Sequence, residues 1–467
     1  MNTESLANTF SGRLITAASD MASFVTDWRQ RWHGSALAVA QPDTTEDVAI
    51  VVRWCAANNV PIVPQGGNTG MSGASVPDTS GNAIVLSLAR LNRVREIDVL
   101  NNTMTVEAGC ILQSLQEAAC EAGRLFPLSL GAEGSCTIGG NLSTNAGGVA
   151  VLRFGNAREL CLGLEVVTAQ GEIWNGLRGL RKDNTGYDLR DLYVGAEGTL
   201  GVITAATMKL FPLPAAKVTA WVAVNTVHDA LRLLEIAQTK LGARLTAFEM
   251  LTPPCIEILI EQLPDVRWPL ATRETQAVLI ELSDPESETN GRASLEAMLE
   301  SAFESGLVTD AAIAANLTQS REFWSLRERM TEAQQRAGKN IKHDISVPIS
   351  RIGDFVESTN ALLATHYPGV RMIVFGHLGD GNLHYNVSPL TGATGENFEE
   401  IEAAINRITH DAVHAFNGSV SAEHGLGVLR RGEAARYKSD VELRLMGAIK
   451  NALDPQAIMN PGKGLPL

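Results

Sequence analysis

Residues 64–73 read PQGGNTGMSG and place four glycines among Asn68, Thr69 and Ser72. Without Cβ atoms, such a loop can turn several backbone N–H groups into one concavity, which suits a diphosphate. The loop is neither G-x-G-x-x-G nor G-x-x-x-x-G-K-[ST], so the common nicotinamide and nucleoside-triphosphate fingerprints do not apply. On its own, a loop of this kind is better explained as an ordinary surface turn.

The segments on either side of this loop predict a helix and short strands. Residues 44–59 place apolar residues at helical spacing behind Thr44 or Thr45 as the N-cap, and a strand is expected at 60–63. After the loop, residues 83–108 alternate strand-like runs with turns. Residues 111–122 are expected to form a helix that ends at Gly123.

Two more glycine-rich segments follow in the same half of the chain. Residues 131–148 read GAEGSCTIGGNLSTNAGG, a glycine density that favours a ligand-binding loop over a packed helix, and residues 194–204 read VGAEGTLGVIT. With the first loop they form an ordered set of three. This set resembles the FAD domain of the vanillyl-alcohol oxidase and para-cresol methylhydroxylase superfamily, over about residues 35–213.

The resemblance implies that the first loop wraps the pyrophosphate of FAD and that the other two line its ribose, pyrophosphate and isoalloxazine. No histidine lies between residues 34 and 227, so these loops cannot attach the flavin through histidine, and Cys136 is interpreted as a packing residue. The flavin is therefore expected to be non-covalent. The residues implied to bind it are Gly66, Gly67, Asn68, Thr69, Gly70, Ser72, Gly131, Ser135, Thr137, Gly139, Asn145, Gly198 and Ile203.

Composition excludes several other classes of protein. The net charge of −14, without a long basic run, argues against nucleic acid as a partner. None of the six cysteines forms a CxxC pair, which argues against an iron–sulfur cluster or a zinc ribbon, and the thiols are interpreted as reduced. No apolar run is long enough to cross a bilayer, and the first residues do not resemble a secretory signal, so a cytoplasmic location is expected.

The pattern of expected elements changes after FPLP at 211–214. Strand-like runs then alternate with helices near 228–241 and 294–306, which predicts a separate α+β unit. The expected fold class is α+β: a two-subdomain FAD-binding domain of the vanillyl-alcohol oxidase type at 1–213 (core 35–213), a substrate and metal (cap) domain at 214–420, and a C-terminal segment at 421–467 that returns to the flavin site.

Seven of the nine histidines fall between residues 343 and 424. Residues 373–387 (IVFGHLGDGNLHYNV) predict a hairpin that brings His377 and His384 to one end of a sheet, and SAEHGLG at 421–427 adds Glu423. Two imidazoles and one carboxylate leave coordination positions open, which suits a catalytic Zn²⁺ or Mn²⁺ rather than Ca²⁺. The alternatives are ordinary hairpin histidines, or a rival metal pair at His410 and His414 on one helix.

GHLGDGNLHYN, AEHGLG and the terminal NPGKG narrow the resemblance, over nearly the whole chain, to the FAD-linked D-2-hydroxy acid dehydrogenases that act on D-2-hydroxyglutarate, D-lactate or glycolate. This resemblance implies that His377, His384 and Glu423 ligate the metal and that His424 is the general base. It also implies that Asn460 touches the flavin and that the substrate is held by Asn386, Arg327, Thr331 and Lys342.

Arg327 and Thr331 are four residues apart on a predicted helix and are therefore expected to share a face, although a solvated charged helix is the alternative. His343 stands where family members often carry an aromatic residue. The expected reaction is oxidation of a D-2-hydroxy acid to the 2-oxo acid, with D-2-hydroxyglutarate ahead of D-lactate and glycolate because Arg327 and Lys342 could serve a dicarboxylate.

Two readings of another class remain open. One is a non-redox transferase of the alkylglycerone-phosphate synthase kind, which shares the flavin scaffold, and the other is a flavin-binding subunit of a larger dehydrogenase complex. No second redox motif occurs in the sequence, so an external electron acceptor is expected, either electron-transfer flavoprotein or a quinone-linked carrier. The chain is expected to act alone or as a homodimer.

Overall fold

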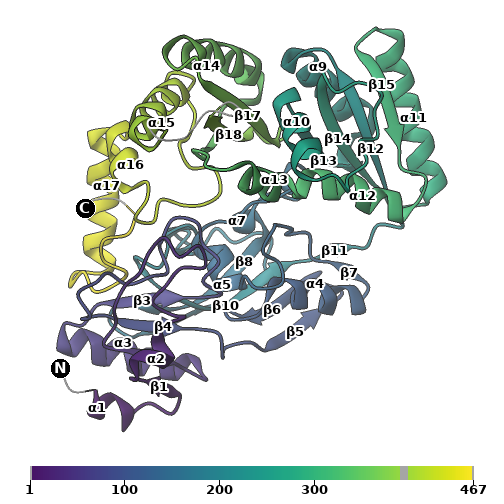
Figure 1. Cartoon of the computed structure of the whole chain (residues 1–467). Helices are drawn as coiled ribbons and strands as arrows, with labels where there is room; N and C mark the ends of the chain where they lie inside the picture. The colour runs from purple at the N-terminus through teal and green to yellow at the C-terminus, as the bar shows by residue number, and fades with distance from the viewer. Residues whose placement is uncertain (1–2, 390–397, 465–467) are drawn as a thin grey trace. The chain divides into compact units, whose positions relative to one another are not determined.

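The computed structural model describes residues 3–389 and 398–464. The chain forms two compact units (Figure 1). Unit 1 comprises residues 1–147, 154–213 and 423–467, and unit 2 comprises residues 148–153 and 214–422. Because unit 2 is inserted into unit 1, the last segment of the chain returns to the unit in which the chain began.

The first sheet of unit 1 has the strand order β1 (Arg13–Ile15), β2 (Ala38–Gln41), β4 (Ile84–Ser87), β3 (Ile62–Gln65), in which β2, β4 and β3 are parallel. Helix α3 (Thr45–Asn58) connects β2 to β3 and confirms the predicted helix. Its N-cap is Thr44, whose hydroxyl accepts a hydrogen bond from the N–H of Asp47 at 3.1 Å. The 64–73 loop follows β3 and leaves the sheet at the end where a parallel sheet commonly binds ligands.

The second sheet of unit 1 is antiparallel, in the order β5 (Val94–Asp98), β6 (Thr103–Glu107), β10 (Gly201–Lys209), β8 (Cys161–Thr168), β9 (Ile173–Gly176). Helix α4 (Leu112–Glu121) packs its buried leucines into the core of this part, and Gly123 follows it at φ +70°, as predicted. Further elements outside the two sheets are α1 (Glu4–Ala7), α2 (Ala18–Met21), β7 (Arg124–Leu125), α6 (Val151–Phe154), α7 (Ala157–Leu160), α8 (Arg190–Tyr193), β11 (Phe211–Pro212), α16 (Arg431–Tyr437) and the longer α17 (Asp440–Leu453).

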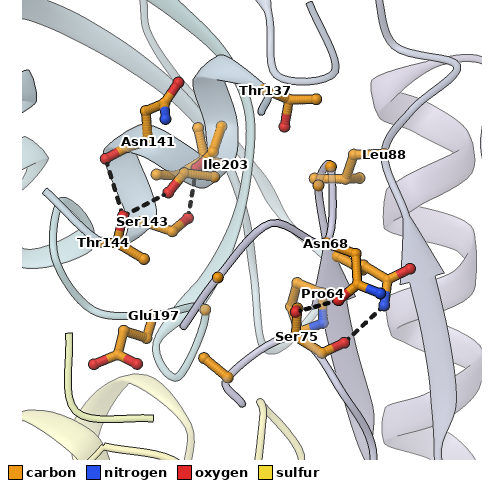
Figure 2. Close-up of a pocket in the computed structure, with 18 of the residues that line it drawn as sticks. Pro64, Asn68, Ser75, Leu88, Thr137, Asn141, Ser143, Thr144, Glu197 and Ile203 are labelled. Atoms are coloured by element: carbon orange, nitrogen blue, oxygen red, sulfur yellow. Dashed lines mark hydrogen bonds between the residues drawn. The ribbon is translucent and has the colours of Figure 1, made fainter. Parts of the chain in front are cut away.

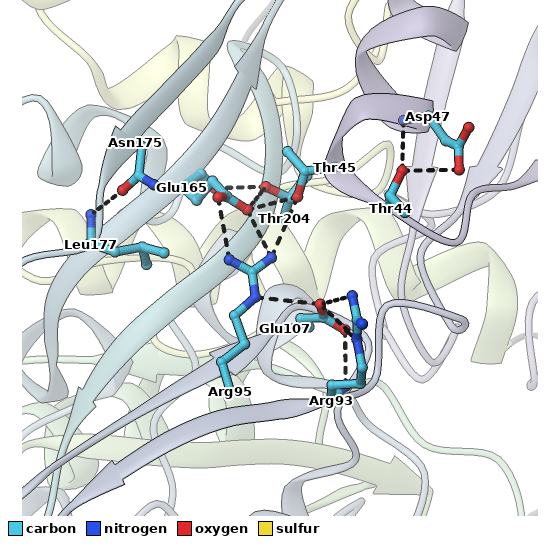
Figure 3. Close-up of polar contacts among 10 residues, drawn as sticks. All are labelled: Thr44, Thr45, Asp47, Arg93, Arg95, Glu107, Glu165, Asn175, Leu177 and Thr204. Atoms are coloured by element: carbon cyan, nitrogen blue, oxygen red, sulfur yellow. Dashed lines mark hydrogen bonds and ion pairs between the residues drawn. The ribbon is translucent and has the colours of Figure 1, made fainter.

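A polar network joins helix α3 to the second sheet of unit 1 (Figure 3). Glu165 on β8 accepts hydrogen bonds from Thr45 of α3 at 2.7 Å, from Thr204 of β10 at 3.0 Å and from the Arg95 guanidinium at 3.0 Å. Arg95 also contacts Glu107, which is fully buried. Burial would raise the pKa of Glu165, but the hydrogen bonds from Arg95 and Thr45 outweigh it and hold that pKa below its usual value.

The prediction that residues 131–148 form a loop throughout is wrong for the middle of the segment. Helix α5 (Ile138–Ser143) lies there and contains Gly139 and Gly140. A Cβ atom on Gly139 would lie 2.6 Å from the Cβ atom of Ala108, so glycine allows this short helix to pack directly on the chain after β6. Tertiary packing thus overrides the low helix propensity of glycine.

Unit 2 is built on one sheet with the strand order β15 (Val308–Ile313), β12 (Ala216–Val224), β14 (Gln276–Asp284), β13 (Leu245–Leu251), β17 (Val370–His377), β18 (Asn382–Pro389), β16 (Asp344–Ser346). All its pairs are antiparallel. Helices cover both faces (Figure 1); they are α9 (Val227–Leu241), α10 (Pro253–Gln262), α11 (Glu288–Glu304), α12 (Leu317–Glu328), α13 (Met330–Ala337), α14 (Ile352–His366) and α15 (Phe398–Ala415), with the short 3₁₀ turns Gly242–Arg244 and Ile349–Arg351. The predicted α+β class is confirmed.

The single helix predicted across Arg327 and Thr331 is two helices. Helix α12 ends at Glu328 and α13 begins at Met330, because Arg329 between them has ψ 4° and leaves the helical region. Arg327 is buried and Thr331 is exposed. The two side chains therefore do not share one helix face, and the 3.6-residue spacing fails at this junction.

Within residues 3–389 and 398–464, no helix combines the length and the low charge that a membrane span requires.

Candidate active site

A pocket in unit 1 is lined by the three glycine-rich segments that the sequence singled out (Figure 2). The space between these segments is about 860 Å³ when its mouth, which is open to solvent, is included. The lining comes from residues within 64–75, 136–144 and 197–203, from Leu88, and from His424 and Asn460 of the returning segment. Segments far apart in the sequence thus converge on one cavity.

Glycine is required where these segments meet. A Cβ atom on Gly67 would lie 2.0 Å from the carbonyl oxygen of Ser135, and one on Gly66 would lie 2.4 Å from the hydroxyl of Thr137. Gly70, by contrast, has open space where its Cβ atom would be. The first loop therefore packs against the second through bare backbone, which leaves its remaining N–H groups available to a ligand.

Two buried polar atoms of the pocket lining have no hydrogen-bond partner in the described part of the chain. They are the hydroxyl of Thr137 and the side-chain oxygen of Asn460, and both residues line the pocket. Buried polar atoms in native proteins are nearly always paired, so a polar ligand is the natural partner for both. The glycine contacts and these two atoms fit a diphosphate-containing cofactor such as FAD.

Unit 2 brings the two hairpin histidines together. In the β17–β18 register His377 pairs with Asn382 and Phe375 with His384, and the two imidazole centroids are 5.7 Å apart. Nδ1 of His377 lies 2.6 Å from a carboxylate oxygen of Glu249. An imidazole that donates Nδ1–H to a carboxylate presents Nε2 as its acceptor, the arrangement usual for a metal-ligating histidine.

Glu249 on β13 also accepts a 2.7 Å hydrogen bond from Nε of Arg327. Burial would raise the pKa of this carboxyl, but the neighbouring His377 and Arg327 outweigh it and hold the pKa below its ordinary range. Arg327 further stacks on the ring of Phe375 at 5.0 Å. Its two terminal nitrogens form no hydrogen bond within the described residues, so they can receive a carboxylate.

Comparison with known proteins gives matches over nearly the whole chain. A family model for the C-terminal domain of FAD linked oxidases matches residues 213–464, and one for an FAD binding domain matches residues 36–176. The mitochondrial D-2-hydroxyglutarate dehydrogenase of Arabidopsis thaliana is 38% identical over 94% of this chain and 77% of its own. The mitochondrial D-2-hydroxyglutarate dehydrogenase of Danio rerio is 39% identical over 97% of this chain and 83% of its own.

The chain belongs to the FAD-linked oxidase family. It is an FAD-dependent oxidoreductase, as the three loops and the histidine motifs predicted.

Solved structures show the same fold at low sequence identity. Alkyldihydroxyacetonephosphate synthase matches this FAD-linked oxidase with a TM-score of 0.75 at 16% identity, over 98% of this chain and 84% of that one. p-Cresol methylhydroxylase matches with a TM-score of 0.74 at 16% identity, over 96% of this chain and 93% of that one. The predicted superfamily fold is thereby confirmed, while these two likenesses say nothing about the reaction.

Most residues predicted to bind FAD lie in the pocket of this FAD-linked oxidase. Three do not line it, namely Gly131, Ser135 and Asn145. Ser135 is exposed and meets Gly67 through its backbone, while Asn145 accepts a hydrogen bond from the N–H of Arg158 at 3.0 Å. The predicted residues that do line the pocket are Gly66, Gly67, Asn68, Thr69, Gly70, Ser72, Thr137, Gly139, Gly198, Ile203 and Asn460.

The predicted substrate residues have different surroundings. Asn386 is buried, its amide oxygen accepting from the N–H of His343 at 3.1 Å and its NH₂ group donating to Gln334 at 2.9 Å. Lys342 is half-buried directly before His343. The fully solvated alternative is wrong for Arg327, which is only 8% exposed.

The rival histidine pair on α15 is divided between two environments. His410 is buried with its ring 5.4 Å from that of His343, whereas His414 is exposed. Their spacing places them on one helix, but only His410 is buried.

Two functional candidates escaped the sequence reasoning. Glu249 is an acidic residue in the mostly apolar strand LTAFEML at 245–251. Because acidic residues are rarely buried without a partner, its presence in this strand could have indicated a functional residue. Glu197 lies in the AEG motif between two of the predicted flavin residues and lines the pocket. Cys136 is buried in the lining, and burial raises its pKa, in agreement with a packing role.

Proposed function

We propose that this FAD-linked oxidase oxidises D-2-hydroxyglutarate to 2-oxoglutarate. The observation that carries the proposal is the hydrogen-bonded chain Arg327–Glu249–His377, with contacts of 2.7 and 2.6 Å. One buried carboxylate holds a guanidinium that can bind a carboxylate and an imidazole that can bind a metal. The relatives that are 37–39% identical and are named D-2-hydroxyglutarate dehydrogenases support the same substrate.

We further propose that a divalent ion, Zn²⁺ before Mn²⁺, is held by His377, His384 and Glu423. The donor set fits, since two imidazoles and one carboxylate leave positions open for substrate. Asp344, which pairs with His384, accepts a hydrogen bond from the N–H of Ala422 at 3.1 Å. Glu423 is the next residue along the chain, so the covalent backbone supports its inclusion.

The reaction removes a hydroxyl proton and a C2 hydride from the same carbon. When bound, FAD supplies the two-electron acceptor and the ion supplies a Lewis acid for the hydroxyl oxygen. His424, one of the residues that line the pocket, takes the proton at an imidazole nitrogen. Arg327 orients the substrate through one carboxylate; Lys342 is proposed to assist it, and Asn386 to contact the substrate as well, whereas Thr331, exposed on the next helix, is left out.

D-Lactate and glycolate are the alternative substrates of the same chemistry. A non-redox transferase has one point in its favour, the fold likeness to alkyldihydroxyacetonephosphate synthase, which at 16% identity carries the fold alone. The paired histidines with their Glu249 support have no evident task in such a transferase. The reduced flavin would pass its electrons to an external carrier, either electron-transfer flavoprotein or a quinone-linked acceptor.

The test is anaerobic bleaching of the flavin absorbance. We expect D-2-hydroxyglutarate to bleach the purified holoenzyme rapidly, L-2-hydroxyglutarate to leave it unchanged, and EDTA to slow the reaction until Zn²⁺ or Mn²⁺ is restored. His424→Ala should keep its FAD and lose the bleaching. A metal-replete protein whose flavin is bleached by none of D-2-hydroxyglutarate, D-lactate and glycolate would contradict the proposal and favour the transferase.

A further inference from the structure

We propose that Glu197 is a positioning residue that fixes the backbone on which His424 is carried. The inference rests on the proposed role of His424, because it assigns to Glu197 the task of aligning that imidazole with the flavin pocket. All the contacts that support it lie within unit 1.

The carboxylate of Glu197 holds the turn that directly follows His424. One of its oxygens accepts a hydrogen bond from the N–H of Leu426 and the other accepts one from the N–H of Gly427, both at 2.8 Å. Gly425 has φ +69°, and a Cβ atom there would lie 2.9 Å from the carboxyl carbon of Glu197. The turn is therefore both bonded to the carboxylate and packed directly against it.

Ser72 supports the same turn from the first glycine-rich loop. Its hydroxyl lies 3.1 Å from the carbonyl oxygens of both His424 and Gly425 and donates to them. Its own carbonyl accepts from the N–H of Val428 at 2.8 Å. Since Ser72 and Glu197 both line the flavin pocket, the two supports tie the position of His424 to the walls of that pocket.

The backbone of Glu197 is itself constrained. Its φ of +52° is in the left-handed region, which residues other than glycine rarely adopt. The N–H of Glu197 donates to Ser143 at 2.8 Å, and its carbonyl accepts from the side chain of Asn460 at 2.7 Å. Such a conformation persists only where the surroundings enforce it, and such residues cluster at functional sites.

A carboxylate is the side chain that this arrangement requires. Two converging N–H donors need two acceptor oxygens, and an isosteric glutamine offers one oxygen and turns an NH₂ group towards the other donor. Among the described residues, no lysine or arginine forms a salt bridge with Glu197; burial raises its pKa, and the two backbone hydrogen bonds and the more distant charge of Lys463 offset this only in part. A buried acid kept without an ion pair is costly, which argues for a role beyond packing.

Glu197→Gln in the full-length holoenzyme tests the proposal. We expect the amide hydrogens of Leu426 and Gly427 to exchange faster with deuterium while FAD stays bound. The rate of flavin reduction at saturating D-2-hydroxyglutarate should fall about 100-fold, the loss typical of a misplaced catalytic group, with little change in substrate Kd. The matched control is Glu159→Gln, because Glu159 also accepts a backbone N–H, from Asn156 at 2.9 Å, but belongs to α7.

Faster exchange at Leu426 and Gly427 with unchanged flavin reduction would overturn the positioning role, and unchanged exchange would overturn the structural premise. If Glu197→Gln loses FAD, Glu197→Asp serves instead, because it keeps both carboxylate oxygens on a shorter side chain. We expect Glu197→Asp to retain FAD but to show slow reduction of the flavin by substrate. Flavin reduction at the wild-type rate in this variant would also overturn the positioning role. If the wild-type flavin is reduced by no hydroxy acid, the proposed function fails, whereas the exchange comparison still decides whether Glu197 holds the turn.

Discussion

Replacing Glu249 by glutamine should weaken both the proposed metal site and the proposed carboxylate site. The carboxylate accepts one charge-assisted hydrogen bond from His377 and one from Arg327, at 2.6 and 2.7 Å. A glutamine in the same place has one acceptor oxygen and therefore keeps only one of the two contacts. It also removes the negative charge beside Arg327, which is only 8% exposed.

The size of the effect follows from these contacts. Loss of a carboxylate that orients a metal-ligating histidine typically weakens metal affinity about 10–100-fold, which corresponds to about 1.4–2.8 kcal/mol. Leaving the buried guanidinium of Arg327 without its counterion should cost about 3 kcal/mol of unfolding free energy. The KM for a dicarboxylate should rise as well, because the guanidinium is no longer held in one orientation.

The assay is Zn²⁺ titration of the EDTA-treated holoenzyme against a competing chelator, followed by thermal unfolding of the metal-free protein. Glu281→Gln is the matched control, since Glu281 is a buried glutamate of the same sheet that accepts from Trp324 at 2.8 Å. A Zn²⁺ affinity equal in Glu249→Gln and wild type would refute the idea that Glu249 orients His377.

Two further predictions concern unit 1. Gly67→Ala should abolish FAD binding, because the new methyl group would lie 2.0 Å from the carbonyl oxygen of Ser135. The flavin absorbance of the purified protein measures this. A variant that is purified with one FAD per chain would contradict the proposed packing of the loops around the cofactor. Arg95→Leu should lower the unfolding free energy by about 3 kcal/mol at neutral pH by leaving Glu165 without its cation. The pKa of Glu165 is lowered in the folded state, so its ion pair stabilises the fold fully above the unfolded pKa of about 4.3 and loses this effect as pH falls through the lower folded pKa. In urea titrations, the difference in unfolding free energy between wild type and Arg95→Leu should therefore shrink in that acidic range. A difference that stays constant with pH would refute the assignment.

Local signals in the sequence were enough to locate the glycine-rich loops and the hairpin, whereas the assignment of the loops to FAD came from the family resemblance of the three segments together. Glycine marks the places where backbone must approach backbone, as at Gly67, and the GDGN turn fixes the register that brings His377 beside His384. Thr44 likewise marks the start of α3, because an N-cap side chain bonds a backbone N–H in the first turn of its own helix. These predictions succeeded because each depends on residues close together in the sequence.

The failures depended on contacts between distant residues. Glycine at 139 signals a loop by propensity, but its contact with Ala108 makes a short helix the better packed state. Nothing near Arg327 in the sequence reveals that Glu249, 78 residues away, will bind it. The spacing of Arg327 and Thr331 predicted a shared face, and the break at Arg329 separates them.

The division of unit 1 among distant stretches of the chain has a consequence for biosynthesis. The N–H of Ile62 donates to Ile458 and the N–H of Asn460 donates back to Ile62, both at 2.8 Å, so the sheet that carries the first loop is completed by residues made almost 400 positions later. At about 5–20 residues per second, a ribosome needs roughly 20–80 s to cover that interval. During this time the nascent chain has no Asn460 or His424 to close around a flavin. Cofactor loading should therefore wait until residues 458–460 have been synthesised, and a translation arrest before residue 458 should yield a chain that cannot retain FAD.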